Sequence, residues 1–194
     1  MTIKVSFADL THTGQLIAAN TFPLGISFVA AYAKSKLGAS LELDVFKYPD
    51  DFNSYLSKTM PDIACFSSYS WNVALGHEYA RRIKEVSPNT ITIFGGPNFP
   101  GERDEQEKFL AKYSSIDCYL EFEGEIAFVE LFKSLEGFGF DWERFKELRI
   151  VSPNIRYLID GELVTGDLAP KITDLDVLPS PYLTGVNDKF FDDV

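Results

Sequence analysis

Short apolar runs alternate with segments of helical spacing along the first two thirds of the chain. Each run is bounded by Pro, Gly, Asp or Asn, and each has the length of a strand rather than of a helix. The predicted strands are Ile3–Ala8, Leu41–Tyr48, Asp62–Ser67, Thr90–Phe94 and Asp117–Leu120. Because parallel strands need crossover connections, this alternation predicts a parallel sheet with helices on both faces.

The segments between these strands have apolar residues three and four positions apart, for example around Ile26, Leu75 and Phe128. Two shorter helices are predicted at Asp51–Lys58 and Asp104–Tyr113. The stretch LELDVFKY alternates polar and apolar residues like an edge strand, whereas IACF and ITIF are unbroken apolar runs that suit a sheet interior. We therefore predict an α/β fold with a flavodoxin-like, doubly wound, five-stranded parallel sheet in the order 2-1-3-4-5.

The pattern changes after Gly137. DWERFKELR favours a short helix, and NIRYLIDGELVTG contains Asp160–Gly161, which favours a type I′ turn and predicts a β-hairpin. Pro179 and Pro181 then predict an extended linker, and the two phenylalanines of DKFFDDV have no evident partner. We expect an α/β domain at residues 1–136, and a hairpin and linker at 137–194 that lead toward a further part of a longer protein.

The composition of the chain disfavours several classes of binding partner. The formal net charge is −11 over 194 residues, which disfavours nucleic acid and anionic membrane surfaces. No apolar run approaches the roughly 18 residues of a membrane span. Cys65 and Cys118 lie inside apolar runs, as core thiols do in a reducing cytoplasm. Without a Cys-x-x-Cys motif or a His–Cys cluster, we expect no zinc or iron–sulfur site built by this chain alone.

A ligand of an open parallel sheet binds beyond the carboxyl ends of the strands, where the strand order reverses. Four loops meet there: DLTHTGQLIAANTFPLG, which is long and therefore a functional candidate, then SSYSWN, GGPNFPGE and EFEGE. The sequence has no G-x-G-x-x-G, no phosphate-binding P-loop and no G-x-S-x-G motif. A triad of Ser67, His12 and Asp9 is the hydrolytic arrangement that stays open.

The residue types in these loops favour a large neutral ligand. Gly95 and Gly96 follow a buried strand, where absent side chains let a ligand lie against the backbone, unless a turn with positive φ explains them. SSYSWN offers hydroxyls, a carboxamide and aromatic rings, which is more than a helix N-cap needs.

In these stretches the chain resembles the N-terminal cobalamin-binding domain of cobalamin-dependent radical S-adenosylmethionine enzymes. The resemblance rests on FPLGISFVAAYAK, DIACFSSYS, IFGGPNFP and DCYLEFEGEIAFVELF, in this order, and ITDLDVLPSPYL resembles the linker to the catalytic barrel. It implies a cytoplasmic module that presents methylcobalamin to a substrate radical in a methyltransferase. An iron–sulfur cluster and S-adenosylmethionine are then expected only in the catalytic domain of the same polypeptide, and we name no catalytic residue here.

The resemblance also implies where cobalamin binds. Its dimethylbenzimidazole tail is expected in a slot left open by the two glycines, with polar contacts from the serines and apolar contacts to the corrin ring from Tyr69, Trp71 and Phe99. The implied cofactor-binding residues are Thr11, His12, Thr13, Gly14, Gln15, Ser67, Ser68, Tyr69, Ser70, Trp71, Gly95, Gly96, Pro97, Asn98, Glu123 and Gly124.

Two details of the resemblance depart from family patterns. Methionine-synthase-like domains use Asp-x-His-x-x-Gly, whereas this chain has Asp9-x-x-His12-x-Gly14, so we expect base-off cobalamin without a histidine ligand on the metal. Relatives carry Gly-Glu-Gly-Glu where this chain has FEGE; Glu123 and Glu125 either cap the next helix or contact the cofactor or the catalytic domain. The alternative to the whole interpretation is a ligand-sensing or protein-interaction module that lacks the cofactor.

Overall fold

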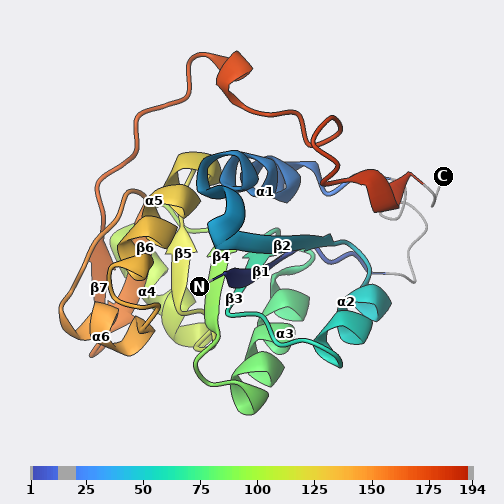
Figure 1. Cartoon of the computed structure of the whole chain (residues 1–194). Coiled ribbons are helices and arrows are strands. Elements are labelled where there is room, and N and C mark those ends of the chain that lie inside the picture. Colours follow the sequence, from blue (N-terminus) through green and yellow to red (C-terminus); the bar gives the residue numbers. More distant parts are fainter. Residues whose placement is uncertain (1, 13–20, 192–194) are drawn as a thin grey trace.

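A computed structural model describes residues 2–12 and 21–191. Its centre is one seven-stranded sheet in the order β2-β1-β3-β4-β5-β6-β7 (Figure 1). The strands are β1 Ile3–Ala8, β2 Leu41–Phe46, β3 Ile63–Ser67, β4 Ile91–Gly95, β5 Cys118–Leu120, β6 Ile155–Ile159 and β7 Glu162–Thr165. The first five are parallel, which confirms the predicted order 2-1-3-4-5, with β2 at the edge.

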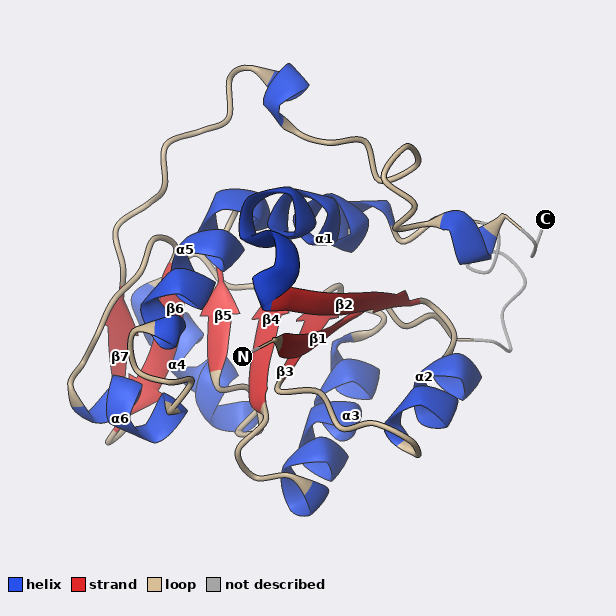
Figure 2. Ribbon diagram, viewed as in Figure 1, coloured by secondary structure: helices blue, strands red, loops and turns tan. Residues whose placement is uncertain are grey.

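Two layers of helices enclose this sheet (Figure 2). Helices α1 and α5 cover one face, and α2, α3 and α4 cover the other. Their bounds are α1 Leu24–Leu37, α2 Pro49–Leu56, α3 Val73–Val86, α4 Arg103–Lys112, α5 Gly124–Glu136 and α6 Trp142–Glu147. The alternating side chains of the strands divide between two cores, one under each layer.

Helix α1 approaches the sheet and α5 closely because its buried residues are small. They are Ser27, Ala30, Ala31 and Ala33. At the facing end of α5, a Cβ atom on Gly124 would lie only 3.0 Å from Cγ2 of Val29. The glycine therefore lets the two helices meet at the carboxyl edge of the sheet.

The hairpin β6–β7 does not stand apart from the sheet, as the sequence led us to expect, but continues it. Strand β6 pairs antiparallel with β5, so the sheet has seven strands rather than five. The hairpin turn has positive φ at both Asp160 and Gly161, as a type I′ turn requires. Trp142 and Tyr157, beyond the predicted boundary at residue 136, share the core of α1 and α5.

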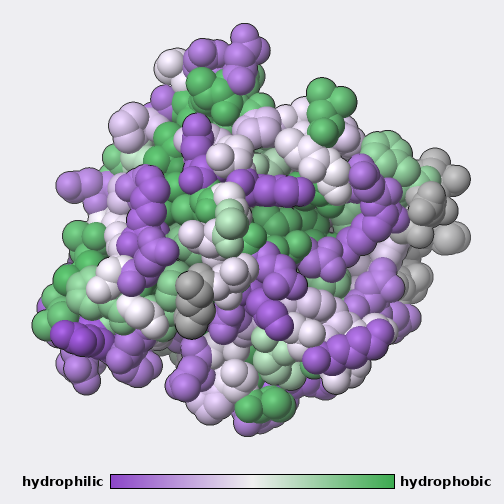
Figure 3. All heavy atoms as spheres, viewed as in Figure 1, coloured by the Kyte–Doolittle hydropathy of each residue, from purple (hydrophilic) through white to green (hydrophobic). Residues whose placement is uncertain are grey.

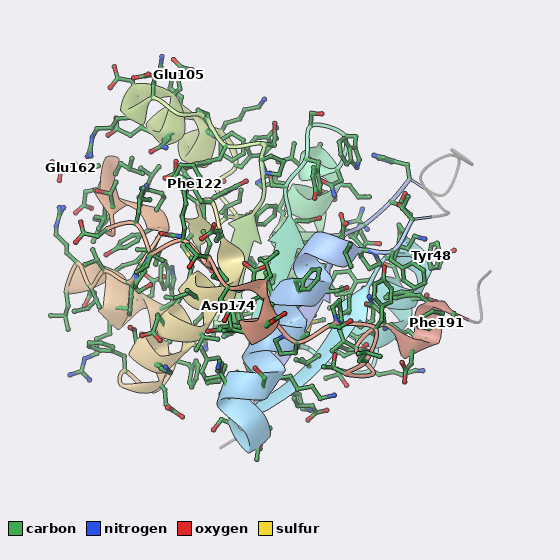
Figure 4. All side chains as sticks on the ribbon, turned by 90° about the horizontal axis from the view of Figure 1, so that it is seen from above. Tyr48, Glu105, Phe122, Glu162, Asp174 and Phe191 are labelled. Carbon is green, nitrogen blue, oxygen red and sulfur yellow. The ribbon has the colours of Figure 1, made fainter. Side chains whose placement is uncertain are left out.

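The segment after β7 forms an extension that crosses above α1 (Figures 1 and 4). One attachment is the Ile172 N–H, which donates to Glu123 Oε2 at 3.4 Å. Further along, Lys34 Nζ donates to Thr184 O at 3.3 Å. Figure 3 shows hydrophobic residues among hydrophilic ones along the top of the view. Leu175 and Val177 of this extension are exposed.

The end of the extension is anchored by aromatic packing, which corrects our expectation that its phenylalanines have no partner. Phe190 is only 4% exposed. The ring of Phe22, just before α1, lies within 5.2–6.5 Å of the rings of Tyr182, Phe190 and Phe191. The partner that buries Phe190 is thus some 170 positions earlier in the sequence, where local pattern cannot reveal it. None of the helices in the described part of the chain is long and apolar enough to cross a membrane.

Candidate functional site

A pocket of about 300 Å³ opens at the carboxyl edge of the sheet, between the strands and the layer of α1 and α5. Its floor is formed by the ends of β1, β3, β4 and β5, and its roof by the first turns of the two helices. The lining residues are mainly apolar and include Phe7, Ile26, Val29, Ile93, Leu120 and Phe128. This is the edge where open parallel sheets bind ligands.

Three glycines leave this pocket open. Gly25 lies at the start of α1, Gly95 at the end of β4 and Gly124 at the start of α5, and all three line the pocket. A Cβ atom on Gly25 would meet Tyr69 Oη at 3.6 Å, and one on Gly95 would meet Leu120 O at 3.3 Å. Side chains at these positions would therefore occupy space at the wall of the pocket, which the glycines leave free.

Gly96 also lines the pocket, but the backbone explains why it is a glycine. Its φ is 128°, and a Cβ atom there would lie 2.7 Å from Ser68 O. An L-residue at this position would be strained and would clash with the backbone. The positive-φ interpretation of the glycine pair therefore holds for Gly96, whereas Gly95 lines the pocket.

A hydrogen-bonded group of Asp9, Ser67 and Asn72 borders the pocket. Ser67 Oγ donates to Asp9 Oδ1, and Asn72 Nδ2 donates to the same oxygen at 3.0 Å and to Ser67 Oγ at 3.1 Å. Burial raises the pKa of the Asp9 carboxyl, although the hydrogen bonds from Ser67 and Asn72 and the charge of Lys47 oppose that shift. Because Ser67 Oγ donates its hydrogen bond to Asp9 and accepts one from Asn72, it keeps one lone pair as a further acceptor.

Tyr69 and Trp71 form an aromatic stack at the rim, with ring centroids 4.4 Å apart and planes 11° apart. Tyr69 lines the pocket, and Trp71 is 58% exposed. Burial, reinforced by the negative charge of Asp9, raises the pKa of Tyr69, so its phenol keeps the proton and remains a hydrogen-bond donor.

His12 lies on the same edge and is exposed. Its Nε2 is 2.7 Å from Trp71 O, and because a carbonyl oxygen only accepts, Nε2 carries the proton and donates it. Ser67 donates to Asp9 and not to His12, so the three residues do not form the serine–histidine–carboxylate relay that a hydrolytic triad requires. This finding overturns the triad alternative.

A smaller cavity of about 160 Å³ adjoins this edge. It is lined by Asp9, Leu10, Thr11, Thr21, Pro23, Lys47 and Trp71. Thr11 and Trp71 thus belong to the predicted site but lie beside the main pocket. Among the described residues, no group of three or more His, Cys, Asp or Glu side chains is placed to hold a metal ion.

The other predicted site residues are spread along the same edge. Ser68 is fully buried, and its N–H donates to Gly95 O at 2.6 Å, which completes the strand pairing. Asn98 N–H donates to Ser68 O at 3.1 Å, whereas Ser70 and Pro97 are exposed. Thr13, Gly14 and Gln15 lie outside the described residues. Phe99 stacks on Tyr119 at 4.1 Å within the opposite core, so it is no part of the pocket.

The FEGE segment lies at the mouth of the pocket. Phe122, Glu123, Gly124 and Glu125 all line it. Glu123 occupies the N-cap position of α5 without a side-chain capping bond, because its carboxylate accepts from the Ile172 N–H instead. Burial, reinforced by the charge of Glu123, raises the pKa of Glu125, although a bond from its own N–H opposes the shift. The capping interpretation therefore fails for Glu123.

Sequence reasoning missed the helical half of the pocket. Gly25, Ile26 and Val29 come from α1, and Phe128 comes from α5. Their apolar members have the spacing of ordinary core residues, so nothing in the pattern separates them from the rest of the helix. Gly25, a glycine in the first turn of a helix, was the one available signal.

Comparison with known proteins shows which family the chain matches. A family model described as the B12 binding domain matches residues 14–132. The cobalamin-dependent radical SAM methyltransferase TokK of Streptomyces tokunonensis is 32% identical over 128 residues, which are 66% of this chain and 17% of TokK. The 2-(S-pantetheinyl)-carbapenam-3-carboxylate methyltransferase of Streptantibioticus cattleyicolor is 32% identical over 130 residues, 67% of this chain and 18% of that protein. The chain thus spans less than a fifth of these relatives.

The fold is also similar to a solved structure. The cobalamin-dependent S-adenosylmethionine radical enzyme OxsB, with aqua-cobalamin and S-adenosylmethionine bound, superposes with a TM-score of 0.68 and 20% identity, over 97% of this chain and 25% of that one. At this identity the likeness concerns the fold alone. Because the family model covers more than half of the chain, the chain belongs to the B12-binding domain family, as its sequence predicts.

Proposed function

We propose that the chain binds cobalamin as the module of a radical S-adenosylmethionine methyltransferase, with the nucleotide tail of the cofactor in the pocket at the carboxyl edge. The observation that carries the proposal is the pocket itself. It is mainly apolar, is about 300 Å³ in volume and has glycines in both its floor and its roof. A volume at the lower end of the range for small-molecule sites suits a flat heterocycle and not the whole cofactor, so the corrin ring would lie outside, across the strand ends.

Two of the polar groups that line the pocket suit a neutral ligand. Ser67 offers a lone pair, and Tyr69 offers a phenolic proton, and neither carries a charge at neutral pH. The amides of the corrin side chains and the ring nitrogen of a benzimidazole are neutral partners for such groups. The stacked rings of Tyr69 and Trp71 add an apolar surface at the rim.

We further propose that no histidine of the chain binds the cobalt, which leaves the cofactor base-off without a protein ligand. The chain has two histidines. Nε2 of His12 is engaged with Trp71 O. His77 packs edge-on against Tyr113, and its Nε2 accepts from the Ser115 N–H at 3.4 Å. When bound, cobalamin supplies a cobalt centre that carries a methyl group, and the residues of this chain hold and orient it.

The iron–sulfur cluster and S-adenosylmethionine belong, in this proposal, to a separate catalytic domain of the same polypeptide, to which residues 137–194 lead. Both curated relatives are much longer than the matched region. We also expect a cytoplasmic protein, in keeping with two unpaired, buried cysteines.

Binding of hydroxocobalamin tests the proposal. The purified chain is incubated with hydroxocobalamin in the dark, separated from free cofactor by gel filtration, and examined by visible absorption. We expect the protein fraction to retain the colour with a base-off spectrum. A colourless protein fraction would instead favour the cofactor-free interaction module.

A further inference from the structure

Phe122 combines two unfavourable features at the mouth of the pocket. Its side chain is 68% exposed, although it is a large apolar ring. Its φ is 60°, in the left-handed region that a bulky L-residue rarely adopts. A glycine would fit this backbone without strain, and a polar residue would suit the exposure. Neither local packing nor backbone preference explains a phenylalanine here.

The backbone on both sides of Phe122 is held by one buried residue, Asn154. The Glu121 N–H donates to Asn154 O at 3.0 Å, and Asn154 Nδ2 donates to Glu123 O at 3.1 Å. Asn154 is itself 2% exposed and fixed by a bond from its N–H to Asp167 O at 2.8 Å. These bonds impose the conformation of residue 122, so the ring cannot relax by a local change of backbone.

The ring borders the pocket while most of its surface faces solvent (labelled in Figure 4). Among residues 2–12 and 21–191, no aromatic ring packs against Phe122, unlike Tyr69, which stacks on Trp71. An exposed apolar ring that lines a pocket and has no aromatic partner among the described residues is placed to be covered by a ligand in that pocket.

We propose that Phe122 is a ligand contact that covers the flat tail of the cofactor once that tail occupies the pocket. This inference rests on the proposed function and adds to it a residue that determines affinity. Burial of the apolar ring under the ligand would offset the backbone strain at residue 122.

Two substitutions distinguish the effect of the ring on binding from the effect of the backbone conformation at residue 122. Phe122→Gly removes both ring and strain, and Phe122→Asn removes the ring but keeps a side chain that tolerates positive φ and restricts the loop. Arg149→Gly is the matched control, since Arg149 is exposed, has a φ of 51° and does not line the pocket. It loses only an exposed ion pair to Glu162, which contributes little.

The readouts are the dissociation constant for hydroxocobalamin, from equilibrium dialysis, and the melting temperature. We expect both Phe122 variants to bind about 10- to 100-fold more weakly, which corresponds to the burial of one phenylalanine ring. Arg149→Gly should bind like the unchanged protein, and neither glycine variant should melt at a lower temperature.

Equal affinity of the unchanged protein and either Phe122 variant would overturn this inference and leave the proposed function standing, as would an affinity loss that merely follows a loss of stability. Absence of binding by the unchanged protein would overturn the proposed function, and this inference with it.

Discussion

Ser27 Oγ, in the first turns of α1, lies 2.7 Å from Oδ1 of Asn187, which is 160 positions later in the chain. Both side chains are completely buried. The contact ties the end of the extension to the helix whose first turn forms the roof of the pocket. The extension is therefore part of the structure that shapes the candidate site.

Replacing Asn187 tests this link. Asn187→Ala removes a buried hydrogen bond while the Ser27 hydroxyl keeps the Pro23 carbonyl as a partner, and we expect a stability loss of roughly 0.5–1.5 kcal/mol. Thermal or urea unfolding measures it. Lys171→Ala, an exposed change in the same extension, is the control and should change stability by less than about 0.5 kcal/mol. If Asn187→Ala left the stability unchanged, the extension would be only loosely attached to α1.

Gly96 should be sensitive to substitution whether or not a ligand is present. Gly96→Ala places a Cβ atom 2.7 Å from Ser68 O at a φ of 128°, and backbone strain alone should lower stability by roughly 1–3 kcal/mol. Chemical denaturation without cobalamin measures this. Gly101→Ala, where a Cβ would meet nothing within 4 Å, is the control. If Gly96→Ala were as stable as the control, the turn that we assign to Gly96 would be wrong.

Glu125 should make stability depend on pH. Burial raises the pKa of Glu125 above its usual value of 4.5, so the folded protein holds this proton more tightly than the unfolded chain does. The contribution of this group to stability is therefore lost as the pH rises from 4.5 through the raised pKa. Glu125→Gln removes the ionisable group while keeping its size.

Melting temperatures across a pH series check this. Glu125→Gln should melt at a higher temperature than the unchanged protein at pH 7, and the difference should shrink as the pH approaches 4.5. Glu136→Gln, at the exposed end of the same helix, is the control and should show no such trend. A Glu125→Gln variant that is less stable at pH 7 would show that the charged carboxylate is favourable where it stands.

His12→Ala should leave the visible spectrum of bound hydroxocobalamin unchanged. The residue is exposed and its Nε2 is bonded to Trp71 O, so removing the ring takes no ligand from the metal in our proposal. Absorption spectra of the two loaded proteins, recorded side by side, test it. A clear shift of the cobalamin bands in the variant would identify His12 as a cobalt ligand after all.

The sequence predicts the parallel part of the sheet because each strand carries its position in its own pattern. Leu41–Phe46 alternates and lies at the edge, whereas residues 63–66 are uniformly apolar and lie inside. The pairing of β6 with β5 was not predictable in this way. It depends on the free edge of Cys118–Leu120, and a hairpin pattern says nothing about which edge it joins.

The candidate site was predictable where it follows strand ends and not where it depends on tertiary packing. Ser67, Tyr69 and Gly95 line the pocket as expected, since the fold rule alone locates them. The contribution of α1 was missed, because Val29 looks like any core residue of a helix. The role of Gly96 was ambiguous, because its φ is set by the neighbouring backbone of Ser68 and not by residue type.

The most direct test of the account is to fill the pocket from the helix side. In Gly25→Leu the new side chain starts at an open wall, where a Cβ meets only Tyr69 Oη at an ordinary 3.6 Å, and leucine favours the helix. Gly101→Leu, where a Cβ meets nothing within 4 Å, is the matched control. Equilibrium dialysis with hydroxocobalamin should give at least about tenfold weaker binding for Gly25→Leu at an undiminished melting temperature, and unchanged binding for Gly101→Leu. Full affinity in a folded Gly25→Leu variant would contradict the claim that this pocket holds the cofactor.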